Sequence, residues 1–338
     1  MPQNSTAPTL AFPLTEPPPP GGLVEIAPGV QWFRLPLPYR LDHVNVYLIK
    51  DEGGWTVLDT GLGTDVCRAA WEAILNGPLA GQRLISMIVT HFHPDHVGLA
   101  GWLADRFGLP LSMPRPEYLY SLALQYAPGD LGADMHRPFF RRHGLSHEVT
   151  EAVLGRGHEY LRQTTGVPTT YHRIQHGDTL RIGVRAFRVI TGGGHALEQA
   201  MLYRPEERLF FAADQVIARI SPNVSVHAME PDLDALGIYL RSLSALRDAV
   251  APDVLVGRGE FGTHLGPVAV QLFGHQLSQR GIGTLSHFRA RDADDDAVIR
   301  VNHDPGIDLG RDGRLCLRTA KRKPEFQREP SAQRGGYL

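Results

Sequence analysis

The sequence predicts an α/β domain, and three observations support this fold class. Short apolar segments typical of β-strands and amphipathic segments with helical spacing both recur along the chain. At 338 residues, 42% of them hydrophobic, the chain is long enough for one large α/β domain with additional segments. Polar residues also follow a strand directly before a helix, where open α/β sheets place their chemistry. The size permits an enzyme but does not by itself argue for one.

The first part of the chain is expected to be rich in strands. Residues 1–22 end in four prolines and two glycines, and we expect a disordered tail because these residues neither pair in a sheet nor pack well. Between residues 24 and 50, short apolar runs broken by Pro and Gly predict successive strands. Then follow a strand at 55–59, a helix at 65–75, a strand at 84–89 and a helix at 97–107.

The second part predicts helices first and then strands again. Residues 114–168 have helical spacing and are expected to form a helical insertion. Later segments predict strands at 179–190, 200–203 and 209–214, a helix at 232–246 and a strand at 253–256. Beyond about residue 285 the periodicity is weak and large apolar residues are few. We therefore expect a folded domain over residues 23–285 and an irregular C-terminal tail over 286–338.

Composition argues against several classes of partner. The 34 basic and 36 acidic residues give a net charge of −2, so nothing supports a broad electrostatic contact with nucleic acid. No apolar run approaches the roughly 18 residues of a membrane span, and no secretory signal pattern follows the first Met. Two cysteines, Cys67 and Cys316, do not make a disulfide framework. A cytoplasmic location without a membrane partner is the expectation.

A dense cluster of histidine and aspartate follows the strand at 84–89. His91, His93, Asp95 and His96 lie within six residues, so their side chains can converge on one small volume. Imidazole nitrogen and carboxylate oxygen are the ligands that zinc and similar cations accept, and a catalytic site leaves one position open for water. The alternative is a histidine-rich polar loop without a metal, but this spacing rarely arises by chance. The sequence therefore predicts a divalent metal site here.

Two later residues gain meaning from this cluster. His195 follows three glycines after an apolar strand, where the backbone can approach a ligand closely. Asp214 likewise ends an apolar run. Taken alone, each is an ordinary turn or cap residue. Together with the first cluster, they are candidates for further metal ligands.

Several segments resemble the metallo-β-lactamase superfamily. Residues 90–98 look like its HxHxDH signature, residues 57–61 resemble the strand that precedes it, and residues 213–215 match the segment of the bridging aspartate. His195 stands where a third metal histidine is expected. The resemblance spans roughly residues 24–257, and hydroxyacylglutathione hydrolases of the glyoxalase II type are among the similar enzymes.

This resemblance implies an αββα sandwich with the metal site along one edge. One zinc ion would be held by His91, His93 and His195, and a second by Asp95, His96 and the bridging Asp214. The resemblance further implies hydrolysis by a metal-activated water, with Asp95 or Asp214 positioning it or relaying its proton. Asp59 either orients a ligand histidine or caps a turn, and the sequence leaves both interpretations open.

The sequence departs from the family at the second metal. The superfamily usually supplies a further histidine after the last strand, where this chain has Arg258. Arginine has no lone pair to donate, so it is not an ordinary ligand, and Arg258 is instead expected at the rim of the site or in solvent. His264 could substitute as a ligand. Whether one or two ions bind therefore stays open.

Three functions are compatible with these residues. The first is a small-molecule hydrolase acting on a carbonyl substrate such as a thioester or lactone. The second is a nuclease that cleaves RNA or another phosphodiester, and the third is a non-catalytic binding protein with a degraded second metal site. The balanced charge and the aromatic residues of the helical insertion favour the first. These aromatic residues either wall a substrate pocket or pack as a helix core, and they are Tyr118, Tyr120, Tyr126, Phe139 and Phe140.

Overall fold

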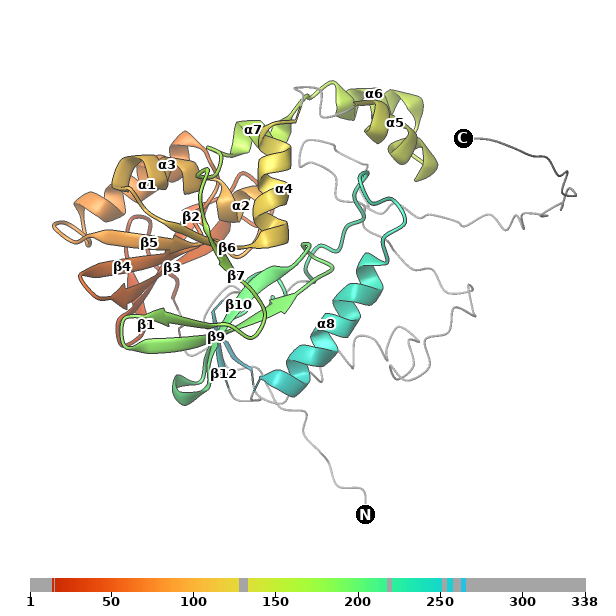
Figure 1. Cartoon of the computed structure of the whole chain (residues 1–338). Coiled ribbons are helices and arrows are strands. Elements are labelled where there is room, and N and C mark those ends of the chain that lie inside the picture. Colours follow the sequence, from red (N-terminus) through yellow and green to blue (C-terminus); the bar gives the residue numbers. More distant parts are fainter. Residues whose placement is uncertain are drawn as a thin grey trace, which may run out of the picture.

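The protein is a sandwich of two β-sheets with helices on both outer faces (Figure 1). The computed structural model describes residues 14, 16–127, 133–217, 221–250, 254–257 and 263–265. Residues 16–22 contain no helix or strand, whereas the predicted tail at 286–338 lies outside the described residues. Within the described part, no helix is both long and apolar enough to cross a lipid bilayer.

The first sheet has seven strands in sequence order. Strands β1 to β4 pair antiparallel, and β4 to β7 continue the sheet in parallel. The strands are β1 (Val24–Ala27), β2 (Val30–Pro36), β3 (His43–Asp51), β4 (Gly54–Leu58), β5 (Leu84–Ile88), β6 (Leu111–Pro114) and β7 (His172–Ile174).

The second sheet has the order β13-β12-β11-β10-β9-β8. All neighbouring strands pair antiparallel except β11 and β12, which are parallel. The strands are β8 (Thr179–Ile182), β9 (Arg185–Gly192), β10 (Gln199–Arg204), β11 (Leu209–Phe211), β12 (Val254–Gly257) and β13 (Thr263–Leu265). The single strand expected at 179–190 is two strands, because Gly183 adopts a positive φ of 55° at the turn between them.

Helices cover both outer faces. Around the first sheet lie α1 (Asp65–Asn76), α2 (Pro94–Val97), α3 (Ala100–Phe107) and α4 (Arg115–Gln125), and α8 (Ala235–Ala249) covers the second sheet (Figure 1). The helix expected at 97–107 is interrupted before Ala100. At Gly98 the chain passes close to the loop of Gly61 and Gly63, where an added Cβ would meet backbone atoms within 2.6 Å.

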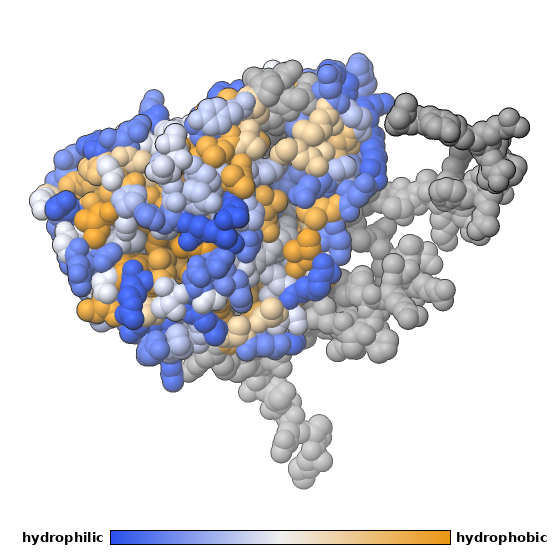
Figure 2. Space-filling view, viewed as in Figure 1, coloured by the Kyte–Doolittle hydropathy of each residue, from blue (hydrophilic) through white to orange (hydrophobic). Residues whose placement is uncertain are grey.

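The segment predicted as a helical insertion contains three helices after α4. These are α5 (Ala133–Arg142), α6 (His147–Leu154) and α7 (Glu159–Gln163). In Figure 1, α5 and α6 stand at the upper right, away from the two sheets. Hydrophilic and apolar residues are interspersed over the face of the molecule seen in Figure 2.

Three buried clusters correspond to the interfaces between the layers. The cluster between the sheets includes Trp32 and Leu58 from the first sheet and Phe187 and Phe211 from the second. A larger cluster joins the first sheet to its helices, and a smaller one joins the second sheet to α8. Apolar surface is thus removed from water on both faces of each sheet, which is the main stabilising contribution to such a fold. The predicted αββα sandwich is confirmed.

Candidate metal centre

The candidate ligands lie on three segments that each follow a strand. His91, His93, Asp95 and His96 follow β5 and run into α2, His195 follows β9, and Asp214 follows β11. The first segment belongs to one sheet and the other two belong to the other sheet. A backbone hydrogen bond of 2.9 Å from Ala200 N to Thr90 O joins β10 to the first segment. The site therefore lies at an edge where the two sheets meet.

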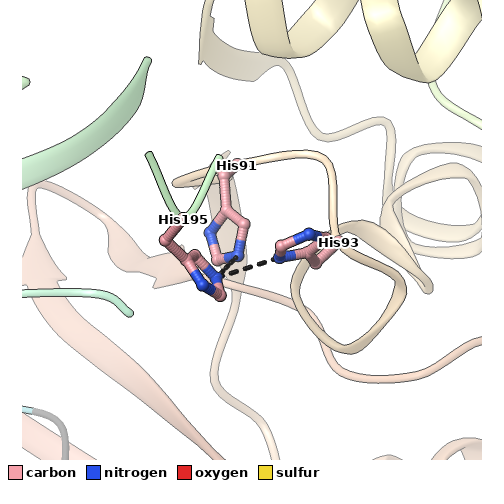
Figure 3. A group of neighbouring side chains, drawn as sticks. All are labelled: His91, His93 and His195. Atoms are coloured by element: carbon pink, nitrogen blue, oxygen red, sulfur yellow. Dashed lines mark hydrogen bonds between the residues drawn. The ribbon is translucent and has the colours of Figure 1, made fainter. Parts of the chain in front are cut away.

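Three histidine side chains point toward one another (Figure 3). The Nε2 atom of His195 lies 3.0 Å from Nδ1 of His93 and 3.3 Å from Nε2 of His91. Two of the three residues are almost fully buried, and His93 is partly buried. The structure thus brings together the three histidines that the sequence proposed as one ligand set.

Hydrogen bonds on the outer side of the rings orient their inner nitrogen atoms. His195 Nδ1 donates to the backbone oxygen of Asn223 at 2.7 Å, and His91 Nδ1 lies 2.9 Å from Oγ1 of Thr90. A neutral imidazole whose Nδ1 carries the proton has its lone pair on Nε2. These contacts therefore direct the Nε2 lone pairs of both rings to the centre of the group.

The carboxylates and His96 form a second group beside the first. Nε2 of His96 lies 3.4 Å from Oδ2 of Asp95 and 3.5 Å from Oδ1 of Asp214. The other oxygen of Asp214, Oδ2, lies 3.4 Å from Nε2 of His195. Asp214 thus faces the first group with one oxygen and the second group with the other, as a bridging ligand would.

Asp59 lies directly behind these ligands. Its Oδ2 is 2.7 Å from Nδ1 of His96, and its Oδ1 accepts the backbone N–H of Thr90 at 2.8 Å. Thr90 Oγ1 also donates to Asp59 and contacts His91, so one carboxylate reaches two histidines. Of the two interpretations of Asp59 from sequence, this contact has the geometry of the orienting one.

The backbone is in a rarely populated conformation on both sides of the site. Asp59 has a φ of 63° directly after β4, and Ala213 has a φ of 46° directly before Asp214. Residues other than glycine seldom adopt such angles, and they persist where the surrounding structure enforces them. The strain therefore falls at Asp59 and directly before Asp214, two of the three carboxylates of the site.

The donor set fits a divalent cation of the zinc type. Nitrogen atoms about 3 Å apart with converging lone pairs repel one another unless a proton or a cation lies between them. Desolvation by burial, reinforced by the neighbouring His195, holds the pKa of His93 well below its usual value, so His93 is neutral and its lone pair is available. Three imidazoles with a carboxylate shared to a second group are the ligand chemistry that zinc accepts.

Two residues that support the site, Glu117 and Gln199, were not identified from the sequence. Glu117 is fully buried and accepts backbone N–H groups from Phe92 and Glu198, which flank the metal histidines. Gln199 accepts the backbone N–H of Asp214 at 3.1 Å and donates to Gln215 at 2.5 Å. An acidic residue at the start of a helix and a glutamine at the start of a strand are common without such roles. Only the fold shows what they contact.

The aromatic residues of the helical region take different positions. Tyr118 is buried, stacks on Tyr171 with ring centroids 3.7 Å apart and donates to Pro168 O, so it belongs to the core. Tyr126 is 71% exposed, whereas Phe139 and Phe140 are partly buried on α5. Among the described residues of this set, Tyr120 alone has a ring contact with the metal segment. Its ring centroid lies 4.6 Å from that of Phe92.

Two further residues near Phe92, His227 and Tyr160, were not identified from the sequence. His227 lies 6.0 Å from the rings of both Phe92 and Tyr120, and Tyr160 donates to the backbone oxygen of Phe92 at 3.1 Å. Burial lowers the pKa of His227 and raises that of Tyr120 to about 12, so both are neutral near pH 7. We refer to Phe92, Tyr120, Tyr160 and His227 as the aromatic wall.

The two residues proposed for the rim differ in how far the structure describes them. Arg258 lies outside the described residues. His264 lies on β13, where its Cα pairs with that of Leu255 across the ladder to β12. Their contribution to the site stays a prediction.

The Metallo-beta-lactamase superfamily profile matches residues 39–257, well over half of the chain and including all six candidate metal ligands. The chain belongs to the metallo-β-lactamase superfamily. The resemblance proposed from sequence is confirmed, and the His/Asp cluster is the metal site typical of this fold. Metal-dependent hydrolysis is the activity that this membership supports.

Similar proteins extend this assignment. A crystal structure of a β-lactamase domain protein from Burkholderia ambifaria is 34% identical, with a TM-score of 0.70 over 80% of this chain and 82% of that one. A metallo-β-lactamase family protein from Thermus thermophilus is 27% identical, with a TM-score of 0.63 over 76% of this chain and 82% of that one.

Curated relatives are more distant. A hydroxyacylglutathione hydrolase from Bradyrhizobium is 22% identical over half of this chain, and the chain spans about half the length of that relative. A Bacillus subtilis protein named "Probable metallo-hydrolase" is 23% identical over 68% of this chain and 70% of its own length.

Proposed function

We propose that the protein is a zinc-dependent hydrolase of small carbonyl substrates, with a thioester or a lactone as the substrate class. The observation that carries the proposal is the position of Asp214 between the two ligand groups, with His195 on one side and His96 on the other. This arrangement gives one continuous site from residues that are remote in sequence. One tightly bound metal ion, with a second metal position beside it, would fit this arrangement.

Zinc held by His91, His93 and His195 would polarise a carbonyl group and lower the pKa of a water molecule toward about 7. The remaining chemistry belongs to the side chains. Asp95 is partly exposed at the start of α2, so its carboxylate can accept a proton from the attacking water and pass it to the leaving group. Asp214 is nearly buried and helps to fix the direction of attack.

The surroundings of the site support a small, partly apolar substrate. The aromatic wall adjoins the metal segment at Phe92 and presents neutral side chains. Balanced charge over the whole sequence gives no reason to expect a polyanionic substrate. The name of the curated hydroxyacylglutathione hydrolase, which matches half of this chain, also favours a thioester.

Metal analysis combined with a substrate panel tests the proposal. The purified protein is assayed for bound zinc and iron, and for turnover of thioester, lactone, β-lactam, phosphodiester and RNA substrates. Zinc together with thioester or lactone turnover is the expected result. RNA or phosphodiester cleavage would favour a nuclease, whereas a protein without metal or turnover would be a binding protein.

A further inference from the structure

We propose that Glu117 is a positioning residue that sets the distance between the two histidine-bearing segments of the metal site. The inference rests on the proposed zinc site. It concerns a residue of helix α4 that touches none of the candidate ligands in any hydrogen bond described above. Its effect on them is transmitted through the backbone.

Both carboxylate oxygens of Glu117 are used on the backbone of ligand segments. Oε2 accepts the N–H of Phe92 at 3.0 Å, and Phe92 stands between His91 and His93. Oε1 accepts the N–H of Glu198 at 2.5 Å, three residues after His195. A single carboxylate group therefore connects the metal segment after β5 to the short segment between His195 and β10.

The burial of Glu117 distinguishes it from an acidic residue that caps a helix at the protein surface. An acidic residue in the first turn of a helix is ordinarily exposed and interacts with its own helix. Glu117 is 0% exposed, and a buried carboxylate carries a large desolvation cost unless hydrogen bonds compensate it. This cost raises the pKa of Glu117 to about 7. Retaining a carboxylate here makes physical sense only if its two hydrogen bonds are needed.

The geometric requirement of the site explains the need. His195 must approach His91 and His93 closely enough for one ion to contact all three, and it arrives through Gly192, Gly193 and Gly194, which have no side chain that could hold this segment against the first sheet. Groups behind metal ligands that lock their orientation typically contribute about 10–100-fold in metal affinity. Glu117 acts in this way on the loop rather than on one ring.

Glu117→Gln is the direct variant, because glutamine has the same shape but only one acceptor oxygen. Its amide NH₂ would face one of the two backbone N–H groups as a second donor, and that segment would move away. The matched control is Glu72→Gln, which removes a carboxylate paired with Arg106 between α1 and α3. Zinc affinity is measured by chelator competition, and the unfolding temperature is measured on the same proteins without metal.

The expected result is a loss of zinc affinity of about 10–100-fold in Glu117→Gln and no change in Glu72→Gln, with all three metal-free proteins still unfolding in one cooperative transition. Zinc affinity in Glu117→Gln within twofold of the unmodified protein would overturn the inference. So would an equal loss in Glu72→Gln, which would indicate a general charge effect. An unmodified protein that binds no zinc would instead overturn the proposed function on which the inference rests.

Hydrogen exchange in the unmodified protein keeps the inference testable if Glu117→Gln does not fold. The amides of Phe92 and Glu198 should both be protected, by at least about a hundredfold, because each donates to the same buried carboxylate. Rapid exchange at either amide would show that Glu117 does not hold the two segments together.

Discussion

The two ligand groups of the candidate site differ in chemistry and in support. The group of His91, His93 and His195 consists of nitrogen atoms 3.0–3.3 Å apart, drawn together from two sheets. The group around His96 is mixed, with carboxylate oxygens 3.4–3.5 Å from Nε2. The first group is complete within the described residues, whereas at the position of the second group's usual further histidine the sequence has Arg258, with His264 as the proposed substitute.

Because the two groups differ in this way, we expect the two metal positions to have unequal affinities for zinc. Three neutral imidazoles with an adjoining carboxylate already supply the usual zinc coordination. The second position depends on Asp95, His96 and the shared Asp214, with Asp59 behind them. We therefore expect one tightly bound ion and one weaker position, and the following variants test the two groups separately.

Replacing a nitrogen ligand of the first group should have the largest effect. His93→Ala removes an imidazole that nothing nearby replaces, so we expect bound metal to be lost and activity to fall by at least about a thousandfold. Metal content and turnover are measured on the same sample. Full activity in a metal-free His93→Ala protein would end the hydrolase interpretation.

Asp59→Asn should act on the second group more than on the first. The charge that faces His96 Nδ1 is lost, and we expect the weaker of the two zinc affinities to fall by about 10–100-fold. The tighter affinity should change less, because Asp59 reaches His91 only through Thr90. Zinc titration calorimetry separates the two values. Equal losses at both positions would contradict the division into two groups.

The raised pKa of Glu117 predicts that the stability of the metal-free protein depends on pH. Its pKa is raised by burial from 4.5 to about 7, so the folded state binds more protons than the unfolded state between these values. The free energy of unfolding should therefore fall as the pH rises from 4.5 to 7, by about 3 kcal/mol from this residue. The free energy of unfolding, measured with urea at pH 5 and at pH 8, should differ less between these pH values in Glu117→Gln than in the unmodified protein. An unchanged difference would argue against the raised pKa.

Arg258→His should have the smallest effect, and it applies to the second position alone. A fixed positive charge at the rim would repel a second cation, whereas a neutral imidazole would bind it. We expect the affinity for the second ion to rise about tenfold and the number of tightly held metals to increase from one toward two. Metal titration of both proteins at one pH provides the test. Two equally tight metals in the unmodified protein would show that Arg258 does not control the site.

The sequence predicted the parts of the site that are contiguous or that share a family pattern. His91, His93, Asp95 and His96 lie within six residues, so local spacing alone brings them near one another. His195 and Asp214 stand at strand ends, where the resemblance supplied their partners. The sandwich fold followed from the same resemblance, and the strand and helix pattern agrees with most of the observed elements.

The supporting residues could not be found in this way. Glu117 is 25 residues from Phe92 and 81 from Glu198, so its two contacts exist only after the sheets have packed together. In sequence it is one more acidic residue near a helix start. His227 likewise has no local pattern, because its neighbours Phe92 and Tyr120 come from other segments. Sequence spacing predicts ligands, whereas the groups behind them depend on tertiary packing.

A crystal structure of the zinc-loaded protein, with anomalous diffraction at the zinc absorption edge, tests the proposed metal centre directly. We predict a strong anomalous peak about 2.0–2.1 Å from Nε2 of His91, Nδ1 of His93 and Nε2 of His195. A second, weaker peak is expected between Asp95, His96 and Asp214. Zinc bound elsewhere, with the three histidines still in hydrogen-bond contact with one another, would contradict the proposed metal centre.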